Sequence, residues 1–150
     1  MISALNLSNN ILKRSFEDDI DVTPMKLQKL IFLVYKEYLK KTKMPLFGER
    51  FAVWKYGPVV QTVYDQFKHR KANAIREYAK DCNGTAKMID ESAPTPFKEV
   101  LDYVWNKYKE IDGIALSGMT HQEGTAWDKA RKSGKPYLSD DDIIAEKEYL

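Results

Sequence analysis

The stretch that decides the fold lies between Thr23 and Lys43 and reads TPMKLQKLIFLVYKEYLKKTK. Threonine followed by proline is a helix start signal, because the threonine oxygen accepts a hydrogen bond from a free amide and proline has no amide to leave free. Apolar residues then recur at helical spacing and cover most of the circumference: Leu27, Leu30, Ile31, Phe32, Leu33, Val34, Tyr35 and Tyr38. A helix that is apolar nearly all round is buried, so we expect a central helix that ends near Lys43.

Lysines follow one side of this predicted helix. At 100° per residue they fall within an arc of roughly 100°, and we call them the lysine stripe: Lys26, Lys29, Lys36, Lys40 and Lys43. We expect the stripe to be exposed, because burying several unpaired ammonium groups would cost more than the net stability of a domain. It is then either a solvated face or a binding surface for an acidic protein or a phosphate backbone. Nucleic-acid readers usually add arginine to such a stripe, and this one has none.

Further helices are predicted on both sides of the central one. Residues 3–18 carry Leu5, Leu12 and Phe16 on one side, and residues 114–119 form a short helical piece. Three more helices begin at recognisable caps: Thr95-Pro96, Thr125 with Asp128 three residues on, and Ser139 before three aspartates.

A small β element is predicted in the middle of the chain. Residues 50–56 alternate apolar and aromatic side chains and predict a strand, which Gly57-Pro58 ends while starting a helix over residues 60–67. Residues 70–80 either extend that helix or form one of their own, and a second strand is expected at residues 86–90. The fold class is therefore mainly α: a single compact domain over residues 1–150, with about six helices and a small two-stranded antiparallel β element.

Composition limits the class of protein. The chain has 150 residues, 43% of them hydrophobic and 31% charged, as expected for one globular domain. Its longest apolar run, residues 30–35, is far shorter than the ~20 residues that span a bilayer, and the N-terminus does not read as a signal peptide. The lone cysteine, Cys82, excludes an internal disulfide. We therefore expect a cytoplasmic protein that does not enter a membrane.

Charge is divided unequally along the chain. Residues 1–75 carry thirteen Lys/Arg and seven Asp/Glu, a balance of +6, whereas residues 76–150 carry eleven and fifteen, a balance of −4. Either the basic half faces an acidic partner or nucleic acid, or the two halves attract each other in the fold.

Motifs for catalysis or cofactor binding are missing from the sequence. No glycine loop that could hold a phosphate occurs, and Ser117 does not lie in a nucleophile elbow. His69, His121 and Cys82 lack the spacing of metal ligands. We therefore predict no catalytic residue, no metal, no cofactor and no enzymatic activity. An unrecognised pair of acids, or His121 with Glu123, is the enzymatic alternative.

Two aromatic segments are the other candidates for function. In the first, Trp54 and Tyr56 either pack under a helix or form an exposed anchor for a partner. In the second, Thr120 or His121 is expected to bond free carbonyls at a corner between helices, and Trp127 is expected to fill the core. The candidates for partner binding are thus Lys26, Lys29, Lys36, Lys40, Trp54 and Tyr56.

Three motifs occur in order along the chain: KLQKLIF from Lys26, WKYGPV from Trp54, and THQEG from Thr120 followed by Trp127. Together they resemble the Panacea-domain family, also called SocA-like or GepA-like, which is associated with phages and mobile elements. The resemblance covers residues 5–133. It departs from the family pattern at Ala126, where the family usually has proline. Within these motifs we expect Gly57, Pro58, Thr120, His121 and Trp127 to be structural.

The resemblance implies an antitoxin that neutralises a small protein toxin, largely by direct binding. One relative delivers its toxin to an ATP-dependent protease, so a protease is a second implied partner. No catalytic or metal site is implied by the motifs. The alternative, from the lysine stripe, is a nucleic-acid-binding regulator of a mobile element. The sequence identifies neither the toxin nor the oligomeric state.

Overall fold

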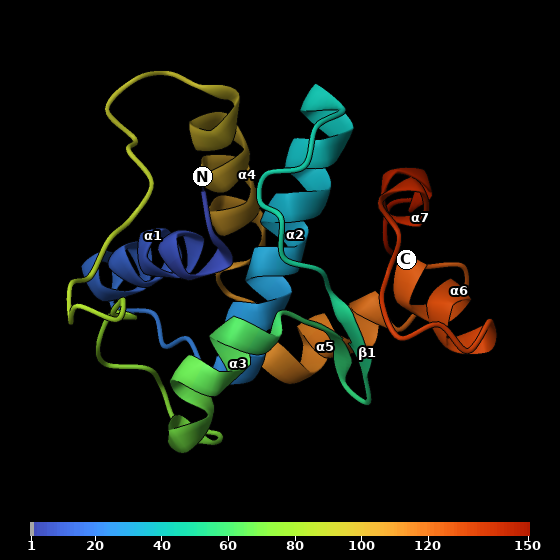
Figure 1. Cartoon of the computed structure of the whole chain (residues 1–150), viewed down its shortest axis with the longest axis horizontal. Helices are drawn as coiled ribbons and strands as arrows, with labels where there is room; N and C mark the ends of the chain where they lie inside the picture. The colour runs from blue at the N-terminus through green and yellow to red at the C-terminus, as the bar shows by residue number, and fades with distance from the viewer. Residues whose placement is uncertain (1) are drawn as a thin grey trace.

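In the computed structural model, which describes residues 2–150, helix α2 (Pro24–Thr42) runs through the centre of the molecule (Figure 1). It begins as predicted, with Pro24 in its first turn and the Thr23 side chain accepting a hydrogen bond from the amide of Lys26. Its apolar side chains from Leu27 to Tyr35 are buried, and helices α1, α4, α5 and α7 pack against it. The prediction of a central, buried helix is confirmed.

Three of the surrounding helices begin at the caps that the sequence indicated. Thr95, Thr125 and Ser139 each accept a hydrogen bond from the amide three residues further on. Residues 2–150 form seven α-helices, so the mainly α fold class is confirmed. Besides α2 they are α1 (Ala4–Asp18), α3 (Gln61–Phe67), α4 (Pro96–Tyr108), α5 (Gly113–Thr120), α6 (Ala126–Lys132) and α7 (Asp140–Ala145), and a short 3-10 helix, η1 (Lys68–Arg70), follows α3. No helix in this part of the chain is both long and apolar enough to cross a membrane.

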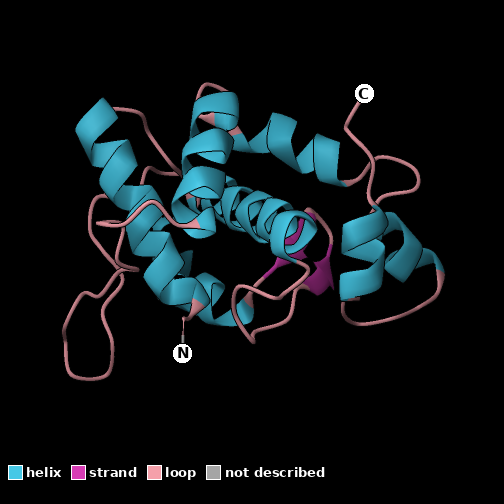
Figure 2. Cartoon of the chain, turned by 90° about the horizontal axis from the view of Figure 1, so that it is seen from above, coloured by secondary structure: helices cyan, strands magenta, loops and turns pink. Residues whose placement is uncertain are grey.

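The β element is a tight hairpin of strands β1 (Ala52–Trp54) and β2 (Gly57–Val59), which lies beside α2 (Figure 2). The strands are antiparallel, as predicted, with Trp54 opposite Gly57 and a two-residue turn between them. The prediction that Gly57-Pro58 would end the strand and start a helix was wrong. These residues form the second strand, and α3 begins only at Gln61, because the positive φ of Gly57 turns the chain back on itself.

Residues 71–95 contain neither the helix expected at 70–80 nor the strand expected at 86–90. Two asparagines of α1 hold this long connection in place of a β partner. The side-chain amide of Asn9 bonds both backbone groups of Ala79, at 2.9 and 2.7 Å, and Asn10 bonds both backbone groups of Ile89, at 2.8 Å each. Asparagine side chains thus supply the hydrogen bonds that a neighbouring strand would otherwise give to this backbone. A search of the sequence for alternating strand residues cannot detect such bonds.

Oppositely charged halves of the chain attract each other. Lys36 pairs with Glu146, Lys41 pairs with Glu99, and Arg14 bonds both Glu91 and Asp102. Each of these pairs joins a cation of the first half to an acid of the second half. The structure therefore supports internal attraction as a cause of the unequal charge distribution.

Candidate functional site

Most of the lysine stripe is not the exposed face that the sequence predicted, and only Lys43 at its end is fully exposed. Lys26, Lys29 and Lys36 are only 5%, 1% and 3% exposed, and Lys40 is half-buried. Their ammonium groups are tolerated inside because each one has an acceptor from a distant part of the chain. Lys29 Nζ donates to the carbonyl of Pro58 at 3.0 Å, Lys36 pairs with Glu146 at 3.0 Å, and Lys26 donates to the carbonyl of Lys109.

The three sequence motifs meet at the β hairpin. From α2, Lys29 Nζ donates to the carbonyl of Pro58, and the side-chain amide of Gln28 bonds both backbone groups of Val60, the residue after β2, at 3.1 and 2.9 Å. From α5, Ser117 Oγ donates to the carbonyl of Tyr56 at 2.6 Å. From α6, Trp127 Nε1 donates to the carbonyl of Trp54 at 2.8 Å. The hairpin is therefore held from three sides by hydrogen bonds to its backbone.

At Gly57 the hairpin backbone lies very close to side chains of α2 and α5. The φ of this residue is +117°, a conformation that favours glycine, and a Cβ there would lie 2.7 Å from Thr120 Oγ1 and 2.9 Å from Lys29 Cε. Thr120 Oγ1 itself donates to the carbonyl of Ser117, as expected for the corner after α5. The missing side chain of Gly57 thus lets β2 approach Thr120 and Lys29 closely.

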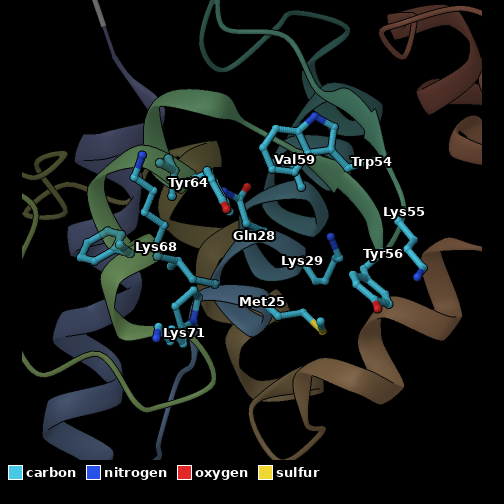
Figure 3. Close-up of a pocket in the computed structure, with 14 residues that line it drawn as sticks. Met25, Gln28, Lys29, Trp54, Lys55, Tyr56, Val59, Tyr64, Lys68 and Lys71 are labelled. Carbon is cyan, nitrogen blue, oxygen red and sulfur yellow. The ribbon is translucent and has the colours of Figure 1, made fainter.

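Beside the hairpin lies a groove of about 490 Å³, which we call the hairpin groove (Figure 3). Met25, Gln28 and Lys29 of α2 line its middle, with the hairpin on one side and α3 and the turn after it on the other. The remaining lining residues are Pro24, Leu27, Trp54, Lys55, Tyr56, Val59, Val63, Tyr64, Phe67, Lys68 and Lys71. Both aromatic candidates of the first segment, Trp54 and Tyr56, therefore belong to one surface.

The two aromatic candidates differ in exposure. Trp54 is half-buried, and its ring meets that of Tyr64 on α3 edge to face, with centroids 4.7 Å apart. Tyr56, at the hairpin turn, is 54% exposed. Of the two alternatives for this segment, Trp54 packs against a helix, whereas Tyr56 is exposed and available to a partner.

The charged side chains that line the hairpin groove are all positive. Its lining contains four lysines and no aspartate or glutamate within the described chain. Lys55, Lys68 and Lys71 are exposed, and Lys29 lies buried among the apolar side chains. Burial lowers the pKa of Lys29 from 10.5 to about 7, because water no longer stabilises the charged amine.

Comparison of the sequence with known proteins identifies its family. Residues 27–128 match the family described as antitoxin SocA-like, Panacea domain. The chain belongs to this family. Antitoxin SocA of Caulobacter vibrioides is 25% identical to the chain over 130 residues, which are 85% of the chain and 69% of that relative. No solved structure matches the chain.

His121 of this Panacea domain packs against Trp127, with ring centroids 4.1 Å apart. Its Nε2 is buried and has no hydrogen-bond partner among residues 2–150. Burial and the nearby Lys29 both lower the pKa of His121, which favours the neutral ring. Glu123 is exposed, and in the described part of the chain no hydrogen bond joins it to His121. The geometry therefore gives no support to these two residues as an acid–base couple.

Glu146, beyond the residues that match the family, is buried and was missed by sequence reasoning. One carboxylate oxygen accepts from the amide of Ala126 at 2.9 Å, and the other binds Lys36 at 3.0 Å and the hydroxyl of Tyr149 at 2.7 Å. Lys40 donates to its backbone carbonyl. Glu146 directly follows the short helix α7, and no local pattern distinguishes it from the exposed Glu148.

Proposed function

We propose that this Panacea domain is an antitoxin that neutralises a small protein toxin by direct, stoichiometric binding in the cytoplasm. Family membership over residues 27–128 is the observation that carries the proposal, together with the similarity to antitoxin SocA. Binding alone suffices for neutralisation, since a complex with a Kd of 1 nM is worth roughly 12 kcal/mol at standard state.

The hairpin groove supports this proposal as the binding surface. Exposed Tyr56, half-buried Trp54 and half-buried Met25 offer apolar area, and tryptophan and tyrosine are frequent among residues that dominate binding energy. Of the four lysines first considered for partner binding, only Lys29 lines this groove. Lys26 and Lys36 are engaged inside the fold, and Lys40 donates to the carbonyl of Glu146.

Co-expression with the small reading frame adjacent to its gene tests the proposal. We expect growth to be rescued, and the two proteins to co-purify in a fixed ratio that light scattering measures. Rescue at sub-stoichiometric amounts of antitoxin, without a stable complex, would instead indicate catalysis. Rescue that requires an ATP-dependent protease would indicate delivery of the toxin for degradation.

The nucleic-acid alternative is tested with the same purified protein. Binding to duplex DNA or to RNA should be weak at physiological salt if the domain is a protein-binding module. Tight binding with a steep dependence on salt, in the absence of any toxin complex, would support a regulator of a mobile element.

A further inference from the structure

We propose that the hairpin groove receives an amphipathic segment of the toxin in which apolar side chains are flanked by carboxylates; this inference rests on the proposed antitoxin function. The occupant is defined by two properties of the groove, its apolar floor and its uniformly positive charge.

The floor of the groove is apolar and already shaped by the fold. Val59, Val63 and Phe67 are buried in the core and present their edges to the groove, while Met25 and Tyr64 leave part of their surface open. A volume of about 490 Å³ is in the range of roughly 300–1,000 Å³ that ligand pockets occupy. Apolar side chains of a partner would therefore gain burial here without any rearrangement of the hairpin.

The rim of the groove attracts carboxylates. Lys55 extends from the hairpin turn, and Lys68 and Lys71 extend from the opposite side (Figure 3). Asp65, 3.7 Å from Lys68, is exposed and lies outside the lining. The first turn of α2 borders the same groove with Pro24 and Met25 and adds the positive end of a helix dipole.

Lys29 adds a buried cation to the floor. Its ammonium donates to the carbonyl of Pro58 and can donate further hydrogen bonds, since the group has three N–H donors. A carboxylate that entered the groove would offset the burial of this charge and so raise the pKa of Lys29 from about 7. This matching of an anion to a buried cation favours a carboxylate directly beside the apolar side chains of the bound segment.

A protein segment fits these features better than a nucleic acid. A phosphate backbone would neutralise Lys55, Lys68 and Lys71 but would leave the apolar floor exposed to water. Arginine, the residue that most often forms paired contacts with phosphates and bases, is absent from the lining within the described chain. The groove therefore matches a partner with both apolar and acidic side chains.

Charge reversal with a matched control tests the rim. The groove variant combines Lys55→Glu, Lys68→Glu and Lys71→Glu, and the control combines Lys13→Glu, Lys129→Glu and Lys147→Glu, which are exposed lysines outside the groove. Both change the net charge equally. We expect the groove variant to bind the purified toxin about 100-fold more weakly than the original chain, and its binding to depend less on salt. The factor follows if each of the three reversed charges loses an ion pair with the toxin worth about 1 kcal/mol. The control should bind like the original chain.

A second pair of variants tests the apolar part of the surface. Tyr56→Ala removes the exposed ring at the hairpin turn, and Tyr103→Ala removes a similarly exposed ring on α4, away from the groove. Tyr56→Ala should weaken toxin binding at least about tenfold, as for a residue that dominates binding energy, whereas Tyr103→Ala should have no effect. Thermal unfolding midpoints of all variants should match that of the original chain, which separates lost binding from lost folding.

Overlapping peptides that span the toxin sequence identify the occupant. The peptides that bind should be acidic and apolar, and their Glu→Gln versions should bind more weakly. Unchanged toxin affinity in both groove variants would overturn this inference while leaving the antitoxin function intact. A missing complex with the original chain would overturn the proposed function itself.

Two other occupants would also contradict the inference. If a DNA or RNA oligonucleotide binds the original chain more tightly than the toxin and the groove variant abolishes that binding, the groove is a nucleic-acid site. If sedimentation shows a dimer that Tyr56→Ala dissociates, a second copy of the chain occupies the groove.

Discussion

The ammonium of Lys36 and the carboxylate of Glu146 form an ion pair of 3.0 Å in the interior, between residues that are 110 positions apart in the chain. The aromatic ring of Tyr149 lies 3.9 Å from the same ammonium, and the Tyr149 hydroxyl donates to the same carboxylate. This cluster fastens the C-terminal segment to the central helix.

Removal of Glu146 should destabilise the protein strongly. Glu146→Ala leaves the ammonium of Lys36 buried without a counter-ion and leaves the Ala126 amide without its acceptor. We expect the free energy of unfolding to fall by about 3–5 kcal/mol in urea titrations. The exposed Glu148→Ala is the control and should change it by about 0.5 kcal/mol or less. Equal effects of the two changes would contradict the buried ion pair.

Stability should depend on pH above neutrality through Lys29. Burial lowers its pKa in the folded protein to about 7, against an ordinary value of 10.5, so between these values the unfolded chain binds more protons than the folded one. The free energy of unfolding should therefore rise with pH, by up to about 1.4 kcal/mol per unit between pH 7.5 and 9. Urea titrations across this range measure the slope, to which Lys26 contributes in the same direction because burial also lowers its pKa.

Lys29→Met provides the control for this pH dependence. The substitution removes the titrating amine while keeping an unbranched side chain, so the slope above pH 7 should become much shallower. At pH 6, where the buried amine of the original chain is charged, the variant should be equally stable or more stable. A slope that Lys29→Met leaves unchanged would show that other groups cause it.

Gly57 should tolerate no side chain, whereas Gly118 should. Gly57→Ala places a Cβ against Thr120 and Lys29 and forces a positive φ on alanine, so we expect a loss of about 1–3 kcal/mol in unfolding free energy. Gly118 lies inside α5, and a Cβ there meets nothing within 4 Å, so Gly118→Ala should stabilise by about 0.5–1 kcal/mol. Thermal or urea unfolding of the two variants compares them directly, and a neutral Gly57→Ala would contradict the close approach.

Trp127 should contribute to stability through both its hydrogen bond and its packing. Trp127→Phe leaves the carbonyl of Trp54 without its donor and should cost about 1–3 kcal/mol in unfolding free energy. Trp127→Ala should cost about 3–5 kcal/mol because it also empties a buried site. Urea titration measures both changes. An equal, small effect of the two substitutions would mean that the ring does not hold the hairpin.

Helix positions were largely predictable because caps and periodicity are local signals. Thr23, Thr95, Thr125 and Ser139 cap helices in the structure as the sequence indicated, through an oxygen and an amide three residues apart. The second strand was misplaced because Gly57-Pro58 is a common start of a helix. Here the positive φ of Gly57 turns the chain into an antiparallel hairpin instead.

The candidate site was only partly predictable. Trp54 and Tyr56 were singled out from the sequence, and in the structure they line the hairpin groove together with Lys29. The apolar floor from α3 and the rim lysines Lys68 and Lys71 were not anticipated, because they come from a segment whose placement depends on packing. Their approach to Trp54 follows from contact between α3 and the hairpin, as in the edge-to-face pair with Tyr64.

The sequence by itself determined the central helix, the caps of three of the helices around it and the family to which the motifs belong. Only the tertiary structure decided that Lys26, Lys29 and Lys36 are buried, because their acceptors come from Lys109, Pro58 and Glu146, which lie far along the chain. Helix formation depends on residues that lie within one or two helical turns of each other in the sequence, so a local sequence pattern can predict it. The environment of a charge depends on which distant groups the fold brings within 3 Å, and for these three lysines those groups turned a predicted surface into part of the interior.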